Sequence, residues 1–291
     1  MGAESTVDVL RRETGVRGLT DREFRQLREL IFREAGIYLS DAKKALLLGR
    51  LSRRLSMLGL TSYGEYYERV AGGDAQERIH MLDAISTNET HFFREPGQFE
   101  FLEKRVLPAW IAAANKGERP RRLRAWSAAC STGEEPYSLA MLLLSMLPPE
   151  LGFSIEVLGS DISTRVLAAA TAGVWPLARA REIPEPHLKR FMLRGVRAQE
   201  GRMKAGPELR ASVRFERINL RNPVHPAGGP FDLVFCRNVL IYFRQEDKAD
   251  VVDRLLAHLA PGGLLLLGHA ESLLGHPSLR PVGPMVYART R

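Results

Sequence analysis

Apolar residues recur at helical spacing through the first third of the chain. Residues 20–23 read Thr-Asp-Arg-Glu, the pattern of a capping box in which the first and last side chains satisfy each other's main-chain N–H groups. Gly36 is expected to end the helix that follows. Three more helices are predicted, over residues 40–59, 62–71 and 74–84. Since no strand pattern interrupts them, residues 19–85 are predicted to form an all-helical domain after a flexible segment at 1–18.

The pattern changes after Pro96, where a helix bent at Pro108 is predicted. Beyond it the predicted elements are strand 123–128, helix 135–147, strand 153–160, helix 163–172, strands 213–218 and 231–236, helix 245–259 and strand 264–268. Residues 179–212 interrupt the alternation and are predicted to be an inserted β-subdomain with a small antiparallel sheet. Residues 281–288 are expected to add an antiparallel edge strand. This order predicts an α/β domain over 98–291, with a mainly parallel sheet covered on both faces, joined to the helices by a linker at 86–97.

Composition agrees with a soluble globular protein, since 45% of the 291 residues are hydrophobic and 26% are charged. The longest apolar run, 264–267, is too short to span a bilayer, and the N-terminus lacks the apolar core of a signal peptide. A cytoplasmic protein without membrane insertion is therefore expected. Cys130 and Cys236 lie in apolar contexts and predict buried thiols, with neither a disulfide nor a metal site.

The net charge of +8 is unevenly distributed. Residues 1–86 hold 14 Lys and Arg against 13 Asp and Glu, whereas residues 179–217 hold 11 against 5. The surplus therefore lies mostly in one insert-like segment. An acidic protein partner would explain it as well as RNA would.

Polar residues gather where the predicted strands end, which is where ligands bind in open α/β sheets. After the first strand, Gly133 allows a close backbone approach, and Glu134 suggests a ligand with a cationic end such as a methionyl amino group. Glu134 could instead be only a favourable charge in the first turn of a helix. Asp161 ends the second strand, where a carboxylate commonly binds ribose hydroxyls. It could instead cap the next helix.

The later strands end in a similar way. Asn219 and Leu220 follow strand 213–218, and the Asn219 amide could contact an adenine edge or only shape a turn. Arg237 and Asn238 end the apolar run 231–236, so they are expected to meet a ligand. A GxGxxG fingerprint is absent, which argues against an NAD oxidoreductase.

Two sequence islands carry a family resemblance: residues 85–96 (ISTNETHFFREP) and 126–138 (WSAACSTGEEPYS). With them the chain resembles the chemotaxis-receptor methyltransferases of the CheR type over about residues 19–287. The resemblance implies a Rossmann-like S-adenosylmethionine-dependent methyltransferase domain with an inserted β-subdomain, preceded by an all-α domain. It implies S-adenosyl-L-methionine as cofactor, S-adenosyl-L-homocysteine as product, and no metal.

The same resemblance implies roles for individual residues. Asn88, Thr90 and Arg94 would contact the cofactor region, so that the linker forms a lid. Arg94 would also orient the substrate carboxylate, although a structural salt bridge is an alternative. Arg237 or Asn238 would touch the cofactor. Tyr242 would lie near the transferred methyl group, or would be a packing aromatic.

The implied substrate is a glutamate side chain of a chemoreceptor, which would become a methyl ester. A glutamate has a pKa of about 4.3, so the nucleophile is already ionised at neutral pH and needs no general base. None of His91, His225, His258 and His269 has an evident partner in the sequence.

Receptor docking is expected on one face of the second predicted helix, formed by Lys43, Arg50, Arg53 and Arg54. This basic face resembles the family's recognition helix for acidic receptor helices. It could also be ordinary solvated surface. The insert 179–212 resembles the β-subdomain that binds a receptor's C-terminal peptide in some members.

Two other functions compete with this one. A nucleic-acid base methyltransferase would fit the net charge, but residues 237–240 read Arg-Asn-Val-Leu where an Asn/Asp-Pro-Pro-aromatic motif is expected. A catalytically silent receptor-binding module is disfavoured because the expected site residues are all present: Asn88, Arg94, Glu134, Asp161 and Asn238. The sequence therefore predicts an enzyme that does not act on nucleic acid.

Overall fold

The structure, a computed structural model, describes residues 16–271 and 276–290. Its contacts divide it into two compact units. The first comprises the described residues up to Thr87 together with a return segment, Tyr242–Asp247. The second comprises Asn88–Ile241 and the described residues from Lys248 onward.

The first unit is helical. Its helices are α2 (Asp21–Ala35), α3 (Lys44–Met57), α4 (Tyr63–Ala71) and α5 (Ala75–Ile85), with a 3-10 turn η1 (Asp41–Lys43) before α3. The predicted capping box is confirmed, because the Thr20 side chain accepts from Glu23 N while Glu23 Oε2 accepts from Thr20 N at 2.9 Å. Gly36 ends α2 with a φ of 72°, a left-handed conformation that glycine adopts without strain.

The core of the first unit includes the apolar stripe of α3, with Leu47, Leu51 and Leu55 fully buried. The return segment completes this core. Tyr38 N donates to Tyr242 O at 2.8 Å, and the Arg244 guanidinium lies 3.6 Å from the centre of the Phe32 ring. The helical unit is thus built from two separate stretches of the chain.

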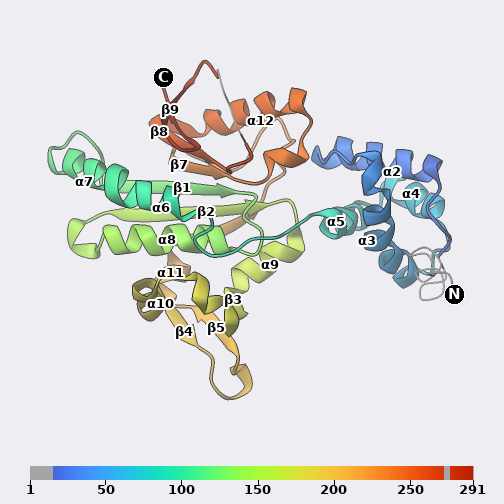
Figure 1. Cartoon of the computed structure of the whole chain (residues 1–291), viewed down its shortest axis with the longest axis horizontal. Helices are drawn as coiled ribbons and strands as arrows, with labels where there is room; N and C mark the ends of the chain where they lie inside the picture. The colour runs from blue at the N-terminus through green and yellow to red at the C-terminus, as the bar shows by residue number, and fades with distance from the viewer. Residues whose placement is uncertain (1–15, 272–275, 291) are drawn as a thin grey trace. The chain divides into compact units, whose positions relative to one another are not determined.

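The second unit contains a seven-stranded sheet in the order β6-β2-β1-β7-β8-β10-β9 (Figure 1). The strands are β1 (Arg122–Ala128), β2 (Ser154–Asp161), β6 (Val213–Arg217), β7 (Phe231–Cys236), β8 (Leu259–Leu267), β9 (Leu279–Gly283) and β10 (Val286–Arg289). The first five are parallel, so the predicted α/β fold is confirmed.

The C-terminal tail differs from the single edge strand expected over 281–288. It forms a hairpin in which β10 pairs with β8 and β9 takes the edge. The turn between them includes Met285 at a φ of 54°, in the left-handed region. The stretch predicted as one strand therefore forms two strands joined by a turn.

Helices cover both faces of this sheet, and Figure 1 shows α8 and α12 on opposite sides of it. They are α6 (Pro96–Phe101), α7 (Leu107–Asn115), α8 (Glu134–Met146), α9 (Thr164–Ala172) and α12 (Gln245–Ala257). The bend predicted at Pro108 takes the form of a widened π-helical segment η2 (Leu102–Val106) between α6 and α7. Proline lacks the N–H that would continue the regular ladder, which gives a reason for the irregularity.

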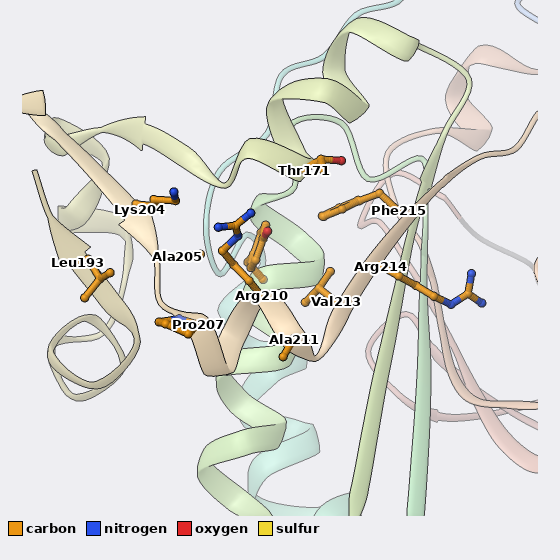
Figure 2. A pocket seen from close by; sticks show the side chains of 11 residues that line it. Thr171, Leu193, Lys204, Ala205, Pro207, Arg210, Ala211, Val213, Arg214 and Phe215 are labelled. Carbon is orange, nitrogen blue, oxygen red and sulfur yellow. The ribbon is translucent and has the colours of Figure 1, made fainter.

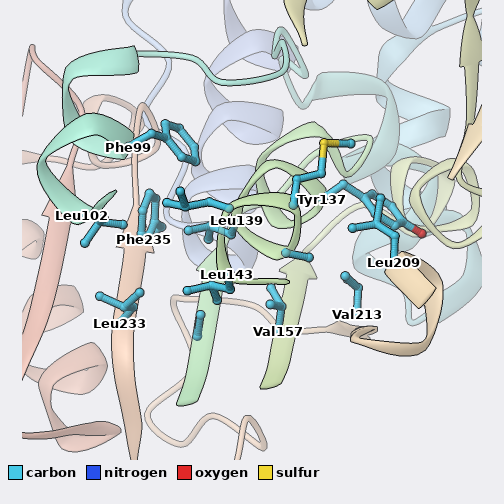
Figure 3. Packing of buried hydrophobic residues seen from close by; sticks show 14 of the residues in the cluster. Phe99, Leu102, Tyr137, Leu139, Leu143, Val157, Leu209, Val213, Leu233 and Phe235 are labelled. Atoms are coloured by element: carbon cyan, nitrogen blue, oxygen red, sulfur yellow. The ribbon is translucent and has the colours of Figure 1, made fainter. Parts of the chain in front are cut away.

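Strand residues alternate between the two faces. Leu233 and Phe235 of β7 join the core cluster with Leu139 and Leu143 of α8 (Figure 3), whereas the intervening Val234 is buried outside that cluster. With both faces buried, the parallel strands read as continuous apolar runs in the sequence.

The insert contains the predicted small antiparallel sheet, in the order β3-β5-β4. Its elements are β3 (Val174–Pro176), the 3-10 segment η4 (Leu177–Glu182), α10 (Glu185–Phe191), β4 (Met192–Arg194) and β5 (Arg202–Ala205). The first strand begins five residues before the predicted start of the insert, and α11 (Pro207–Ala211) leads from the small sheet to β6.

Candidate active site

The strand order reverses between β1 and β7, which are neighbours in the parallel part of the sheet. Beyond their carboxyl ends lie the loops that begin at Ala129 and Arg237, and Asp161 ends the neighbouring β2. Such a switch point is where open α/β sheets bind their ligands. The sequence-predicted residues of these loops therefore share one edge of the sheet.

The loop after β1 has an unusual backbone. Ala129 and Ser131 have φ values of 64° and 50°, and Gly133 has a φ of 94°. A Cβ on Gly133 would lie 3.0 Å from Ala170 Cβ, so a larger residue would be both strained and crowded there. The loop consequently runs close to α9.

Asp161 holds this loop in place. Its Oδ2 accepts from Ser131 N at 2.9 Å and its Oδ1 accepts from Ser163 N at 2.9 Å. Helix α9 is capped by Ser163, whose hydroxyl accepts from Val166 N, so the alternative reading of Asp161 as that helix's cap is wrong. A role in ribose binding stays a prediction, and the carboxylate also has a structural task.

Glu134 is fully buried at the start of α8. Its Oε2 accepts from the Thr132 hydroxyl at 2.6 Å. Its Oε1 lies 3.2 Å from Arg179 Nη1, but the geometry makes no hydrogen bond. Burial raises the pKa of Glu134, and the hydrogen bond from Thr132 and the charge of Arg179 oppose that rise. Glu134 thus offers a buried acceptor atom with no donor among the described residues.

The linker runs against the loop after β1. Asn88 O accepts from Ser131 Oγ at 3.0 Å, and Phe93 N donates to Ser138 Oγ at 2.9 Å. The buried Asn88 Nδ2 has no hydrogen-bond partner in the described part of the chain. Arg94 Nη1 donates to Glu89 O at 3.2 Å, so its guanidinium contacts the linker's own main chain.

The two phenylalanines of the linker pack as anchors. Phe92 is 1% exposed and its ring meets Trp175 edge-on at 5.0 Å between centroids. The Phe93 ring stacks on His187 at 5.3 Å with an interplanar angle of 4°. Both contacts reach the insert, so the linker is fixed between the main sheet and the β-subdomain.

Arg237 has a scaffold role that the strand pattern did not indicate. Its Nε donates to Glu135 Oε2 at 2.7 Å, and its Nη1 donates to Arg94 O at 2.7 Å and to Gln98 Oε1 at 3.1 Å. The side chain is 1% exposed. Any contact of Arg237 with a cofactor stays a prediction, and its main chain is the part left to make one.

Asn238 follows at a φ of 59°, with its N–H bound to Glu271 Oε2 at 2.8 Å. Glu271 also accepts from Leu240 N at 2.7 Å and from Gly268 N at 2.9 Å. This carboxylate therefore shapes the loop after β7 from the end of β8.

The remaining predicted residues are placed differently. Asn219 Oδ1 accepts from Arg221 N at 2.9 Å, which is the turn chemistry foreseen as an alternative, and Leu220 is 6% exposed. Tyr242 belongs to the first unit, and its nearness to the transferred methyl group stays a prediction.

The basic face of the first unit divides into two kinds of residue. Lys43 and Arg53 are exposed and have no acidic partner among the described residues. Arg50 donates to Ile85 O and Thr87 Oγ1, and Arg54 binds Glu77 through Nε at 2.8 Å and Nη2 at 2.5 Å. Arg54 is therefore a structural ion-pair residue, whereas Lys43 and Arg53 remain available for docking.

Several residues of the site were not predicted from the sequence. Arg179, Glu182 and Glu271 each bind main-chain groups of site loops. Glu271 follows the last parallel strand, so the rule about strand ends could have found it. His269, expected to lack a partner, lies with Nδ1 3.2 Å from Glu95 Oε2.

Backbone strain is concentrated at this edge. Five of the seven described non-glycine residues with positive φ lie in the linker or in the loops after β1 and β7: Phe93, Glu95, Ala129, Ser131 and Asn238. Such conformations cost about 1–3 kcal/mol each and cluster at functional sites.

The residues present fit S-adenosylmethionine, the cofactor implied by the resemblance. Its methionyl end carries an ammonium group, which donates, and a carboxylate, which accepts. Two buried atoms without hydrogen-bond partners among the described residues match these needs, the acceptor Glu134 Oε1 and the donor Asn88 Nδ2. No cluster of three His, Cys, Asp or Glu side chains suited to a metal ion occurs in residues 16–271 and 276–290.

A separate cavity of about 530 Å³ lies between the small sheet and β6 (Figure 2). Tyr137, Val213 and Phe215 give it an apolar wall, and the exposed Lys204 and Arg210 stand beside it. It contains none of the predicted cofactor residues.

Comparisons with known proteins agree with this arrangement. Residues 22–86 match the family model described as CheR methyltransferase, all-alpha domain, and residues 88–285 match CheR methyltransferase, SAM binding domain. The chain is 40% identical to chemotaxis protein methyltransferase 2 of Pseudomonas aeruginosa, covering 92% of this chain and 93% of that protein. It is 38% identical to the chemotaxis protein methyltransferase of Salmonella typhimurium, covering 94% of this chain and 92% of that protein. Within the described residues no helix is both long and apolar enough to cross a membrane.

Proposed function

The chain belongs to the CheR methyltransferase family, and from that premise we propose that it methylates glutamate side chains of a chemoreceptor. As a member of this family it is an S-adenosylmethionine-dependent methyltransferase of the chemotaxis system. The proposed products are a protein glutamate methyl ester and S-adenosylhomocysteine. The proposed place of action is the cytoplasm, on the acidic cytoplasmic helices of the receptor.

The cofactor residues proposed are those at the carboxyl edge of the sheet and in the linker: Asn88, Thr90, Arg94, Glu134, Asp161, Asn219, Leu220, Arg237 and Asn238. Glu134 would accept from the ammonium group, and Asn88 would donate to a polar group of the cofactor. The support for these two roles is that each supplies a buried polar atom with no hydrogen-bond partner among the described residues. For Asp161 the support is its place at the end of β2.

When bound, S-adenosylmethionine supplies an electrophilic methyl group on a positively charged sulfur. The receptor carboxylate is ionised at neutral pH, so the protein need not remove a proton. Its task is to hold the carboxylate in line with the methyl group, and such positioning can contribute several kcal/mol. The arginine fork of Arg94 would orient the carboxylate. By the family resemblance, Tyr242 is proposed to act near the transferred methyl group.

Recognition of the receptor is proposed for the first unit. Lys43 and Arg53 are exposed and unpaired within the described chain, so an acidic helix could bind them without breaking internal contacts. Arg50 and Arg54 would contribute less, since their guanidinium groups are already bound.

The β-subdomain is proposed to hold a receptor tail where the receptor has one. The cavity beside Lys204 and Arg210 combines an apolar wall with two cations, which suits a peptide bearing a carboxylate and an apolar side chain (Figure 2).

The observation that carries the proposal is the family match along both units, together with the buried Glu134 Oε1, which has no hydrogen-bond partner among the described residues. The test is incubation with tritiated S-adenosylmethionine and receptor-containing membranes, followed by release of the label in base. Base-labile methyl label on the receptor is expected, and Arg94→Ala should abolish it while leaving cofactor binding partly intact. Label that stays on protein in base, or that appears on RNA, would overturn the proposal.

The docking surface is tested with Arg53→Glu. It should raise the KM for receptor more than it lowers kcat, because the exposed arginine contacts receptor and not cofactor. Arg22→Glu is the matched control, since Arg22 is also exposed in the first unit but lies on α2. Equal effects of the two charge reversals would remove Arg53 from recognition.

A further inference from the structure

Arg179 belongs to the inserted β-subdomain, yet its guanidinium reaches three site groups. It lies on η4 and places Nη1 3.2 Å from Glu134 Oε1. Its Nη2 donates to Thr90 O at 2.6 Å. Its Nε and Nη2 also bind Glu182 on the same turn, at 3.0 to 3.1 Å. One side chain therefore joins the insert, the linker and the start of α8.

Glu182 extends this connection. Its Oε2 accepts from Phe92 N at 3.1 Å, two residues along the linker from Thr90. Arg179 and Glu182 thus bind the linker main chain on either side of His91. The segment that carries Asn88 and Arg94 is held by an ion pair of the β-subdomain and not by the main sheet alone.

The contact with Glu134 has a second consequence. A fully buried carboxylate loses its hydration, so burial alone favours the neutral acid. A neutral Glu134 would be a poor acceptor for an ammonium group. Among the described residues the charged groups facing Glu134 are Arg179 and Glu182, of which only Arg179 favours ionisation. The nearby Cys130 thiol stays neutral because burial raises its pKa.

We infer that Arg179 is a positioning residue of the cofactor site, which keeps Glu134 ionised and holds the linker against it from the β-subdomain. This inference rests on the proposed contact between Glu134 and the cofactor ammonium. It makes the insert part of the cofactor-binding machinery, in addition to any part that it has in docking receptor.

The test is the affinity of the intact protein for S-adenosylhomocysteine, measured by calorimetry. Arg179→Gln should weaken binding by about tenfold or more, because a charge-assisted contact worth about 1.5 kcal/mol is lost. Arg181→Gln is the matched control. It removes the same charge from the same turn, but Arg181 is exposed and has no partner among the described residues.

A pH series separates this role from a purely structural one. Without Arg179 the pKa of Glu134 should rise further, so the affinity of Arg179→Gln should fall more steeply than that of wild type as the pH is lowered from neutral. Arg179→Lys keeps the positive charge but replaces the planar guanidinium with a single ammonium group. It should restore the shallow pH profile while recovering only part of the affinity.

The outcomes distinguish this inference from the function it rests on. If Glu134→Gln leaves the affinity unchanged, the proposed cofactor contact itself is wrong. If Glu134→Gln weakens binding while Arg179→Gln matches Arg181→Gln, only the role of Arg179 is overturned. If Arg179→Gln binds S-adenosylhomocysteine more weakly but its affinity depends on pH as that of wild type does, Arg179 does not act by keeping Glu134 ionised.

Discussion

Arg54 provides the sharpest test of structure against sequence pattern, because it lies on the basic face expected to dock receptor. Its guanidinium forms a two-pronged contact with Glu77, whose side chain is 2% exposed. Burial acts to raise the pKa of Glu77, but hydrogen bonds from Arg54 and the Tyr66 hydroxyl outweigh it and leave the pKa lowered. The carboxylate is therefore charged in the folded protein.

Arg54→Ala would leave this carboxylate buried without its counter-charge. Removing one partner of a buried pair costs about 3–5 kcal/mol, and we expect about 3 kcal/mol here. The lower value applies because Tyr66 Oη still donates to Glu77 at 2.9 Å and because Arg54 is 23% exposed. Arg53→Ala, one residue away and exposed, should change stability by no more than about 0.5 kcal/mol.

The assay is urea unfolding followed by circular dichroism, with tryptophan fluorescence as a second probe. Trp110, Trp126 and Trp175 all lie in the second unit, so fluorescence reports that unit, whereas circular dichroism also detects the helices of the first. The double variant Arg54→Met with Glu77→Gln should recover most of the loss, because no charge is left buried. Equal shifts for Arg54→Ala and Arg53→Ala would refute the reasoning.

Three further predictions follow from the second unit. Asp161→Ala should lower the free energy of unfolding by about 2–3 kcal/mol, because two buried N–H groups lose a charged acceptor. The same variant should bind S-adenosylhomocysteine more weakly. An unchanged affinity in calorimetry would contradict the place of Asp161 in the site. Gly133→Ala should lower the melting temperature through a strain of at least about 1 kcal/mol, whereas Gly97→Ala, whose Cβ would meet open space, should not. Burial lowers the pKa of His225, so the unfolded chain binds more protons than the folded one below about pH 6.5, and stability should fall as the pH drops through that value. His225→Phe should show a shallower loss in denaturation measured across that range, and an identical pH profile would count against this titration.

Much of the fold follows from local periodicity. β1, β2 and β7 begin within one residue of the predicted starts, because buried parallel strands read as apolar runs between turn residues. β8 was harder to predict, because Pro261, Gly262 and Gly263 do not resemble strand residues. The register against β7 shifts at this stretch, between the pairs Phe231–Leu259 and Leu233–Leu264, and a local pattern does not reveal that.

The site was predictable in outline, because strand ends can be located from sequence. What the polar residues there bind could not be foreseen, since it depends on partners far away in the chain. Arg237 is bound by Glu135 and Gln98, which lie 102 and 139 residues away. Arg179 lies in an insert whose sequence shows only an excess of positive charge. Asn88, Glu134 and Asp161 were predicted as cofactor residues, and these roles stay predictions.

The return of Tyr242–Asp247 into the helical unit limits how this protein can be dissected. A fragment ending at Thr87 would lack the carbonyl that binds Tyr38 N and the guanidinium that covers Phe32, so it should be less stable than the same helices in the whole chain. A chimaera that transplants this helical unit onto another methyltransferase must therefore transfer both pieces. A chimaera that exchanges only the N-terminal stretch would lack the part of the helical unit supplied by Tyr242–Asp247.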